Sequence, residues 1–223
     1  MNAYGRRWFV TGLFPALLAA CATAVAPVAP EPAPTAGSAV PLPSAARAAS
    51  AAALVNPGFE STKPGPRGDP EGWYSFQHAG DLSYRFVVDP VEPHGGARSL
   101  RIDNVGPEPY GAISQIVDAV PHVGKVARLT AWLKTRDAND NGAVLTLLVL
   151  QDGATLAQNF MLDAPVKGST GWTRYTITLP IAQGANRLEV GAMMRGRGSL
   201  WLDDVELEFV TPSRASSQWS GAA

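Results

Sequence analysis

Apolar side chains at every second position are the feature that most constrains the fold of this chain. Residues 82–88, 99–103 and 174–179 all alternate in this way. A period of two places successive side chains on opposite faces of a strand, whereas an amphipathic helix needs a period near 3.6. Gly- and Pro-containing turn signals, such as Asn141-Gly142 and Asp152-Gly153, separate the runs. The pattern predicts about nine or ten strands in an all-β sandwich or barrel, and it excludes helical repeats and coiled coils.

Two further runs are apolar at nearly every position, Ala143–Leu150 and Ala185–Met194. A strand that is covered on both faces loses the alternation because neither face meets water. We therefore expect these two runs to form central strands.

The N-terminal segment has the layout of a bacterial signal peptide. Arg6 and Arg7 precede an apolar stretch, Phe9–Ala20, that is too short to span a bilayer. Its end, Leu18-Ala19-Ala20-Cys21, resembles the lipobox of bacterial lipoproteins, and Cys21 is the only cysteine of the chain. The resemblance implies lipidation at Cys21 and anchoring in the cell envelope. The alternative is an ordinary secretory signal with an unmodified thiol. In bacterial lipoproteins, an Asp directly after the lipidated cysteine favours retention in the inner membrane. Here Ala22 follows Cys21, which points to the outer membrane.

Four segments are expected. Residues 1–20 form the lipoprotein signal peptide and residues 21–53 a disordered Ala/Pro-rich tether, in which six prolines between positions 27 and 43 keep the chain extended. Residues 54–210 form one β-sandwich domain, which is long enough for a full core. Residues 211–223 form a disordered tail.

Charge and motif content exclude several functions. The formal net charge is −1, from 18 basic and 19 acidic side chains, so the chain lacks the basic surface of a nucleic-acid binder. The three histidines show no metal-ligand spacing, and neither a nucleophile elbow nor a phosphate-binding glycine loop is present. A triad assembled from distant loops stays open, but we expect a binding module and not an enzyme.

Four sequence patterns, in order, resemble galactose-binding-like jelly rolls, in particular carbohydrate-binding modules of the family 4/9 type. They are Leu54–Glu60 with Gly72-Trp73, then His94–Ile102, then Ser114–Val117 with Leu129–Lys134, and finally Trp172 with Gly198–Val205. Accessory jelly rolls of bacterial peptidases, esterases and transcriptional regulators look closer still, in Tyr110–Gln115 and Lys167–Trp172. The resemblance implies a jelly-roll β-sandwich. It does not settle the function.

The resemblance also implies a structural calcium ion between the opening loop and the last strand. Its ligands would be Glu60, Asp203 or Asp204, and carbonyl groups near Gly58 and Arg98. Calcium prefers six to eight oxygen ligands, which such a set supplies. The alternative is that these carboxylates only make hydrogen bonds and ion pairs. Adjacent strand residues point to opposite faces, so Asp203 and Asp204 act together only if a bulge intervenes.

Sugar sites pair aromatic platforms with polar side chains. We rank Trp132 and Gln115 highest as ligand-binding residues, with Tyr110 and Trp73 next. Trp132 lies on the strand phase opposite Leu129 and Leu133, and a buried Gln115 would need hydrogen-bond partners. Further polar candidates are Gln151, Asn159 and Arg195.

The first hypothesis for the function is therefore an envelope-anchored, non-catalytic jelly roll that binds a glycan or another small polar ligand. The rival hypothesis is an interaction or scaffold domain without a sugar site. A hydrolase ranks third.

Overall fold

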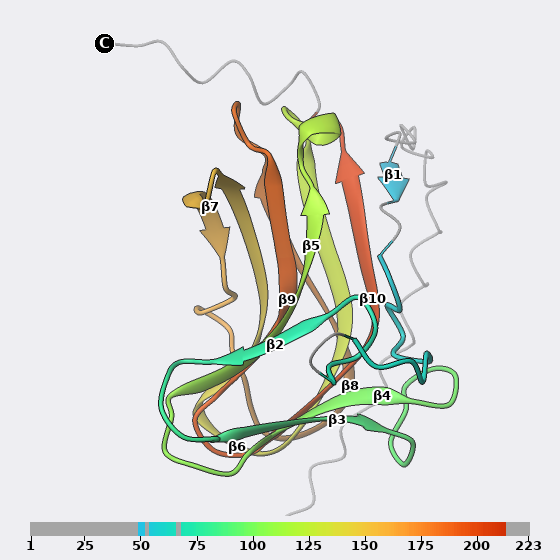
Figure 1. Cartoon of the computed structure of the whole chain (residues 1–223), viewed down its shortest axis with the longest axis vertical. Coiled ribbons are helices and arrows are strands. Elements are labelled where there is room, and N and C mark those ends of the chain that lie inside the picture. Colours follow the sequence, from blue (N-terminus) through green and yellow to red (C-terminus); the bar gives the residue numbers. More distant parts are fainter. Residues whose placement is uncertain (1–48, 52–53, 66–67, 213–223) are drawn as a thin grey trace, which may run out of the picture. The chain divides into compact units, whose positions relative to one another are not determined.

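The computed structural model describes residues 49–51, 54–65 and 68–212, and these residues form an all-β sandwich, as predicted (Figure 1). The predicted signal peptide, Cys21 and most of the predicted tether and tail lie outside the described residues. A single turn of 3-10 helix, η1 (Val120–His122), accompanies the strands. The strands are β1 (Ala49–Ala51), β2 (Tyr74–Gln77), β3 (Tyr84–Asp89), β4 (Ser99–Asn104), β5 (Tyr110–Asp118), β6 (Val126–Gln151), β7 (Ala154–Asn159), β8 (Val166–Pro180), β9 (Arg187–Arg195) and β10 (Ser199–Val210).

All pairings are antiparallel, and β6 belongs to both layers of the sandwich. The main order is β2-β5-β9-β6-β10-β4-β3, with β7 and β8 also paired to β6 and β1 paired to β10. The first part of β6, up to Arg136, pairs with β10, and its second part, from Ala143 to Leu150, pairs with β9. The sheet therefore folds over at β6, and its two halves face each other.

The expected turn at Asn141-Gly142 is not a turn between strands. These residues lie inside β6, which curves between its two parts (Figure 1). Gly142 has a φ of +63°, and the pairing with β8 shifts register between Ala138 and Ala143. The glycine thus lets one long strand change layers, because its missing Cβ permits a left-handed backbone.

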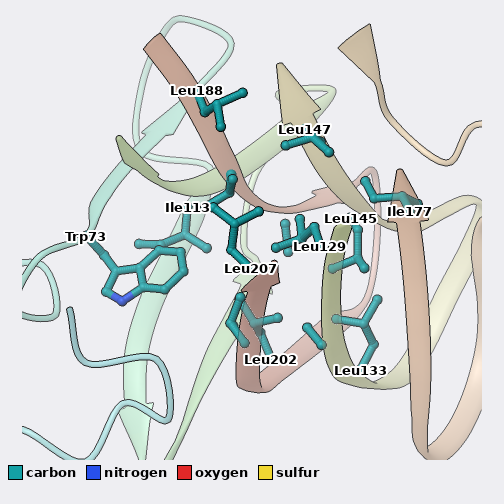
Figure 2. Close-up of a cluster of buried hydrophobic side chains, with 14 of the residues drawn as sticks. Trp73, Ile113, Leu129, Leu133, Leu145, Leu147, Ile177, Leu188, Leu202 and Leu207 are labelled. Carbon is teal, nitrogen blue, oxygen red and sulfur yellow. The ribbon is translucent and has the colours of Figure 1, made fainter. Parts of the chain in front are cut away.

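The core fills the space between the two halves. Figure 2 shows Leu129 and Leu133 of β6 and Leu202 and Leu207 of β10 near Ile113 of β5 and Leu188 of β9. All six side chains are buried. Alternation along each strand supplies these residues to one face, so the period-two pattern accounts directly for the core.

Both all-apolar runs form central strands, as expected. Ala143–Leu150 is the second part of β6, and Ala185–Met194 covers most of β9. In their outward phases, Val144 of β6 and Met193 of β9 form a second buried cluster with Ala112 of β5, against which Tyr110 and Met161 pack. This outer face is therefore apolar and covered in part.

One short strand lies outside the bounds predicted for the domain. Residues 49–51, which the predicted tether includes, pair as β1 with β10 in the register Ala49 to Val210. An Ala-rich segment carries no alternation to reveal an edge strand, because its side chains are all small. The last strand of the described residues ends at Val210. No helix among the described residues is long and apolar enough to cross a membrane.

Candidate functional site

Gln115, expected to bind ligand, is buried beneath the opening segment. Its side chain is only 5% exposed. The Val55 N–H donates to Gln115 Oε1 at 2.8 Å, and Gln115 Nε2 donates to the Val55 carbonyl at 2.8 Å. The amide thus satisfies both backbone groups of Val55, as a neighbouring strand would. Gln115 presents almost no surface to a ligand and holds the start of the domain in place.

Trp73 supports the same segment from the core. It is 3% exposed, and its ring packs on Phe59 with centroids 5.1 Å apart. Its indole N–H donates to the Asn56 carbonyl at 3.1 Å. Trp73 therefore has no exposed ring face to offer to a ligand, because its ring packs against the core.

Trp132 lies on the predicted outer phase of β6 and is half-buried. The His94 ring stacks on it with centroids 3.9 Å apart and planes 18° from parallel. His94 also meets Trp172 edge-on, at 5.6 Å, and its Nδ1 lies 2.7 Å from Asp204 Oδ2. One face of the indole is thus occupied by a histidine that a carboxylate fixes, which leaves a smaller platform than expected.

Glu60, Asp203 and Asp204 lie together where the opening loop meets β10, as the resemblance implied. A methyl group added at Gly58 would lie 3.6 Å from Asp204 Oδ1 and 3.7 Å from Asp203 Oδ1. The Glu60 Cγ would be 3.9 Å away. The β6 pairing of β10 shifts register between Asp203 and Glu206. This bulge and a φ of +45° at Asp204 bring the neighbouring carboxylates to one notch.

Backbone N–H groups already donate hydrogen bonds to two of these carboxylates. Asp203 Oδ2 accepts from His94 N at 2.8 Å and Gly95 N at 3.1 Å, and Glu60 Oε1 accepts from Ala97 N at 2.8 Å. Burial raises the pKa of the Asp203 carboxyl, and the bonds from Gly95 and His94 oppose that shift. Among the described residues, no three His, Cys, Asp or Glu side chains are arranged to hold a metal ion. A calcium site here would have to draw on carbonyl oxygens as well.

Tyr110 lines a large hollow on the outer face of the β2-β5-β9-β6 layer, which we call the sheet-face hollow. Its volume is about 460 Å³. It is lined by Phe76, Tyr110, Ala112, Ser114, Thr146, Leu148, Phe160, Leu162, Glu189, Met193 and Arg195. Tyr110 is thus the one high-ranked residue that reaches it, and Arg195 joins from the wider set of candidates.

Strand register explains the shape of the hollow. Phe76 pairs with Ala112, which pairs with Met193, and Ser114 pairs with Gly191 in the next outward row. Small side chains at the centre of the face leave space there. Larger side chains stand at its borders: Phe76 and Tyr110 on the β2 side, Phe160 and Leu162 beyond the end of β7. Phe76 and Leu162 are 39% and 52% exposed, so apolar walls are open to a ligand.

Opposite charges mark two positions along β9 in the hollow. Glu189 and Arg195 share the outward phase and are six residues apart, which corresponds to roughly 20 Å of strand. Arg195 Nη1 donates to the Asn141 carbonyl at 3.3 Å. Next to the hollow, burial and then the Glu189 carboxylate raise the pKa of the Tyr74 phenol, so this group stays protonated and is able to donate. The hollow therefore offers apolar contact in its middle and polar groups at its ends.

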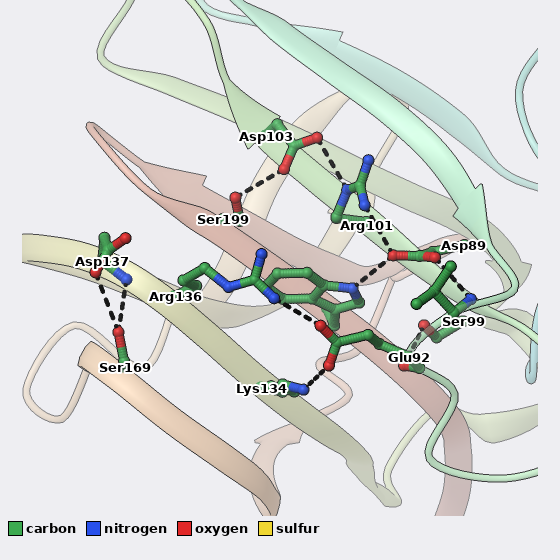
Figure 3. Close-up of polar contacts among 12 residues, drawn as sticks. Asp89, Glu92, Ser99, Arg101, Asp103, Lys134, Arg136, Asp137, Ser169 and Ser199 are labelled. Atoms are coloured by element: carbon green, nitrogen blue, oxygen red, sulfur yellow. Dashed lines mark hydrogen bonds and ion pairs between the residues drawn. The ribbon is translucent and has the colours of Figure 1, made fainter.

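The outer face of the other layer is closed by ion pairs (Figure 3). The indole of Trp201 is fully buried, with the Arg136 guanidinium 4.7 Å from its centroid. Asp89 Oδ2 accepts from Trp201 Nε1 and from Arg101 Nη1, each at 2.9 Å. Burial alone would raise the pKa of Asp89, but hydrogen bonds from Val91 N, Trp201 and Arg101 hold it below its ordinary value. These groups satisfy one another, and they cover the ring of Trp201.

Sequence reasoning missed Phe76, Phe160 and Glu189. Phe160 follows a strand and belongs to no alternating run, so no periodicity singles it out. Glu189 interrupts the apolar run of β9 in its outward phase, and this interruption was the available signal.

Comparison with known proteins supports the fold. No protein-family model matches the chain. The uncharacterized HTH-type transcriptional regulator YbfP of Bacillus subtilis (strain 168) is 24% identical over 123 residues, which are 55% of this chain and 41% of that protein. The chain thus matches less than half of the length of this curated relative.

Among solved structures, a cyclase from Fischerella sp. TAU matches with a TM-score of 0.54 and 14% identity, over 74% of this chain and 99% of the cyclase. An arabinose-bound α-L-arabinofuranosidase, MgGH51, matches with a TM-score of 0.50 and 15% identity, over 70% of this chain and 26% of that enzyme. The CBM22-1 xylan-binding domain of Paenibacillus barcinonensis Xyn10C has a TM-score of 0.47 and 14% identity, over 70% of this chain and 93% of that domain. At such identities a likeness concerns the fold alone, and the fold is a jelly-roll β-sandwich.

Proposed function

We propose that this domain binds a glycan in the sheet-face hollow and catalyses no reaction on it. The observation that carries the proposal is the pair of facing apolar walls over a floor of small residues. Tyr110 and Phe76 stand on one side and Phe160 on the other. Sugar rings have apolar faces that stack on aromatic side chains, and a hollow of this kind presents such side chains from two directions.

The polar groups of the hollow suit the edges of a sugar. Ser114 and Thr146 line the floor with hydroxyl groups, and Glu189 and Arg195 add a carboxylate acceptor and a guanidinium donor. Hydroxyl groups of a ligand both donate and accept hydrogen bonds, so this mixture pairs with them whatever their orientation. Nothing in the arrangement demands a charged ligand, because the two charges have opposite signs.

The proposed setting is the bacterial cell envelope, with an anchor on Cys21 and a glycan or envelope polymer as the partner. The Ala/Pro-rich segment would then separate the domain from the membrane. Support comes from the sequence pattern around Cys21. We propose the outer membrane on the same ground, and no nucleic acid as partner because the net charge is −1.

Retention on insoluble polymers tests the proposed function. The full chain is passed over cellulose, xylan, galactan, chitin and peptidoglycan, and bound protein is measured. Tyr110→Ala and Phe160→Ala should each abolish most of the retention, since a few aromatic anchors carry most of the binding energy. Trp172→Ala is the matched control, because it removes a half-exposed aromatic side chain from outside the hollow.

Three outcomes separate the interpretations. Retention that survives Tyr110→Ala and Phe160→Ala but not Trp132→Ala moves the site to Trp132. Absence of retention on every polymer favours the interaction or scaffold domain. Release of soluble sugars from a retained polymer would show an enzyme.

A further inference from the structure

A second hollow adjoins the first at the edge of the sandwich. Its volume is about 400 Å³, and we call it the edge hollow. Its lining includes Gln158, Asp163 and Leu179, and it shares Phe160 and Leu162 with the sheet-face hollow. The two hollows therefore meet at one short ridge, formed by Phe160 and Leu162, and a molecule that leaves one across this ridge enters the other.

The ridge is held in a defined conformation. Asn159 Oδ1 accepts from Met161 N at 3.0 Å, and Asn159 Nδ2 donates to the Thr178 carbonyl of β8 at 3.2 Å. Met161 has a φ of +52° and packs against the core. Met161 also packs against the outer cluster of Ala112, Val144 and Met193, so it is anchored from two sides, and its neighbours Phe160 and Leu162 line the hollows. The bond to Thr178 also ties the end of β7 to β8, so the ridge has a fixed place at the edge.

The two hollows differ in polarity. The lining of the sheet-face hollow is mostly apolar, with Ala112, Leu148 and Met193 beside the hydroxyl groups of Ser114 and Thr146. In the edge hollow, the side chains of Gln158 and Asp163 are exposed and bring an amide and a carboxylate. A chain of sugar rings presents both kinds of surface, because each ring has an apolar face and a rim of hydroxyl groups. A small apolar molecule would gain nothing from the polar edge hollow.

We infer that the two hollows form one continuous binding path across the Phe160–Leu162 ridge, and that its ligand is an oligosaccharide chain and not a single sugar. The inference rests on the proposed glycan-binding function. One part of the oligosaccharide lies on the sheet face between Tyr110 and Phe160. The next part of the oligosaccharide crosses the ridge and makes hydrogen bonds to Gln158 and Asp163. The path turns from the face of one layer to the sandwich edge, so it suits a chain that bends between successive rings.

Chain length is the variable that tests this inference. Oligosaccharides of one to six units are prepared from the polymer that the wild type retains, and affinities are measured by isothermal titration calorimetry. Affinity should rise at least about tenfold between the single sugar and the longer chains, which corresponds to about 1.4 kcal/mol. The double variant Gln158→Ala/Asp163→Ala should lose this gain and keep the wild-type affinity for the shortest ligand that binds.

Two comparisons make the result specific. Arg195→Ala, in the sheet-face hollow, should weaken ligands of every length. Leu156→Ala, an exposed apolar residue of β7 that lines neither hollow, should change none of the affinities. Equal affinity for one and six units, or a length-dependent gain that survives in the double variant, overturns the continuous path while the proposed function stands. Failure of the wild type to bind any polymer overturns both.

Discussion

At the scale of single residues, Gln115 shows how a polar side chain that looks like a ligand group serves the fold instead. Its amide takes up both backbone groups of Val55. Gln115→Ala should lower the free energy of unfolding by about 1–3 kcal/mol, because two backbone groups lose their partners. It should leave glycan retention intact. Gln183→Ala, at an exposed glutamine, should stay within about 0.5 kcal/mol of the wild type. Chemical denaturation measures both, and lost retention at unchanged stability would restore the ligand role of Gln115.

His122 is a residue whose protonation state affects stability. Its ring stacks on Phe209 with centroids 3.4 Å apart. Burial lowers the pKa of His122 below its ordinary value of 6.5, nearby Lys125 lowers it further, and Asp118 opposes the shift. Between the folded-state pKa and 6.5 the unfolded chain binds more protons, so stability rises with pH in that window. The contribution is complete above pH 6.5 and is lost as the pH falls toward the folded-state pKa.

His122→Gln should therefore flatten the fall of the melting temperature between pH 7 and pH 5. His78→Gln is the matched control, because His78 is an exposed histidine that makes one ion-pair contact, with Glu108. The same slope in wild type and His122→Gln would contradict the role of burial at this position.

At the scale of elements, the junction between the opening loop and β10 decides whether the domain uses a metal. We propose that a structural calcium ion binds there to Glu60 and to one of the two carboxylates of Asp203 and Asp204, with carbonyl oxygens completing its ligands. The notch beside Gly58, toward which the two aspartates direct oxygens, supports this proposal. The ion would bind only the folded state, so calcium at 100 times its dissociation constant would add about 2.7 kcal/mol of stability.

Calorimetric melting with calcium and with excess chelator measures this difference. If Glu60 is a ligand of the calcium ion, the Glu60→Gln variant should have the same melting temperature with calcium and with chelator. If the wild type melts at the same temperature with and without chelator, the calcium proposal is rejected. The carboxylates would then only accept hydrogen bonds from residues 94–98.

At the scale of the whole molecule, we propose that anchoring and binding belong to different segments of the chain. We propose that Cys21 carries the lipid, with several acyl chains, because one chain alone holds a protein to a membrane only marginally. Cys21→Ser should abolish incorporation of labelled palmitate and release the protein from the membrane fraction. The purified variant should keep the glycan retention of the wild type. Palmitate labelling that persists in Cys21→Ser would reject the anchor.

The sequence by itself determined the fold class and the core. The period-two pattern identified the strands, because a half-buried strand can satisfy burial on one face only if its residues alternate. It also identified the central strands, and it placed Leu129 and Leu133 on the strand phase opposite Trp132. It placed Glu60 and the Asp203-Asp204 pair at one junction through the resemblance to jelly rolls. It missed the edge strand at Ala49–Ala51 and the continuity of β6, because alanines do not alternate and a glycine inside a curved strand looks like a turn.

Only the tertiary structure decided which polar and aromatic residues are buried and which line a hollow. Trp73 and Tyr110 are both aromatic candidates in the sequence, yet Trp73 packs on Phe59 and Tyr110 borders the hollow. The difference depends on which segment covers each side chain. The opening segment that covers Trp73 and Gln115 contacts them across 17 and 60 residues of sequence. The hollow likewise joins residues of β2, β5, β6 and β9 to the segment after β7. Its shape follows from strand order and register, which local sequence patterns do not encode, because pairing partners are chosen by the packing of the whole sheet.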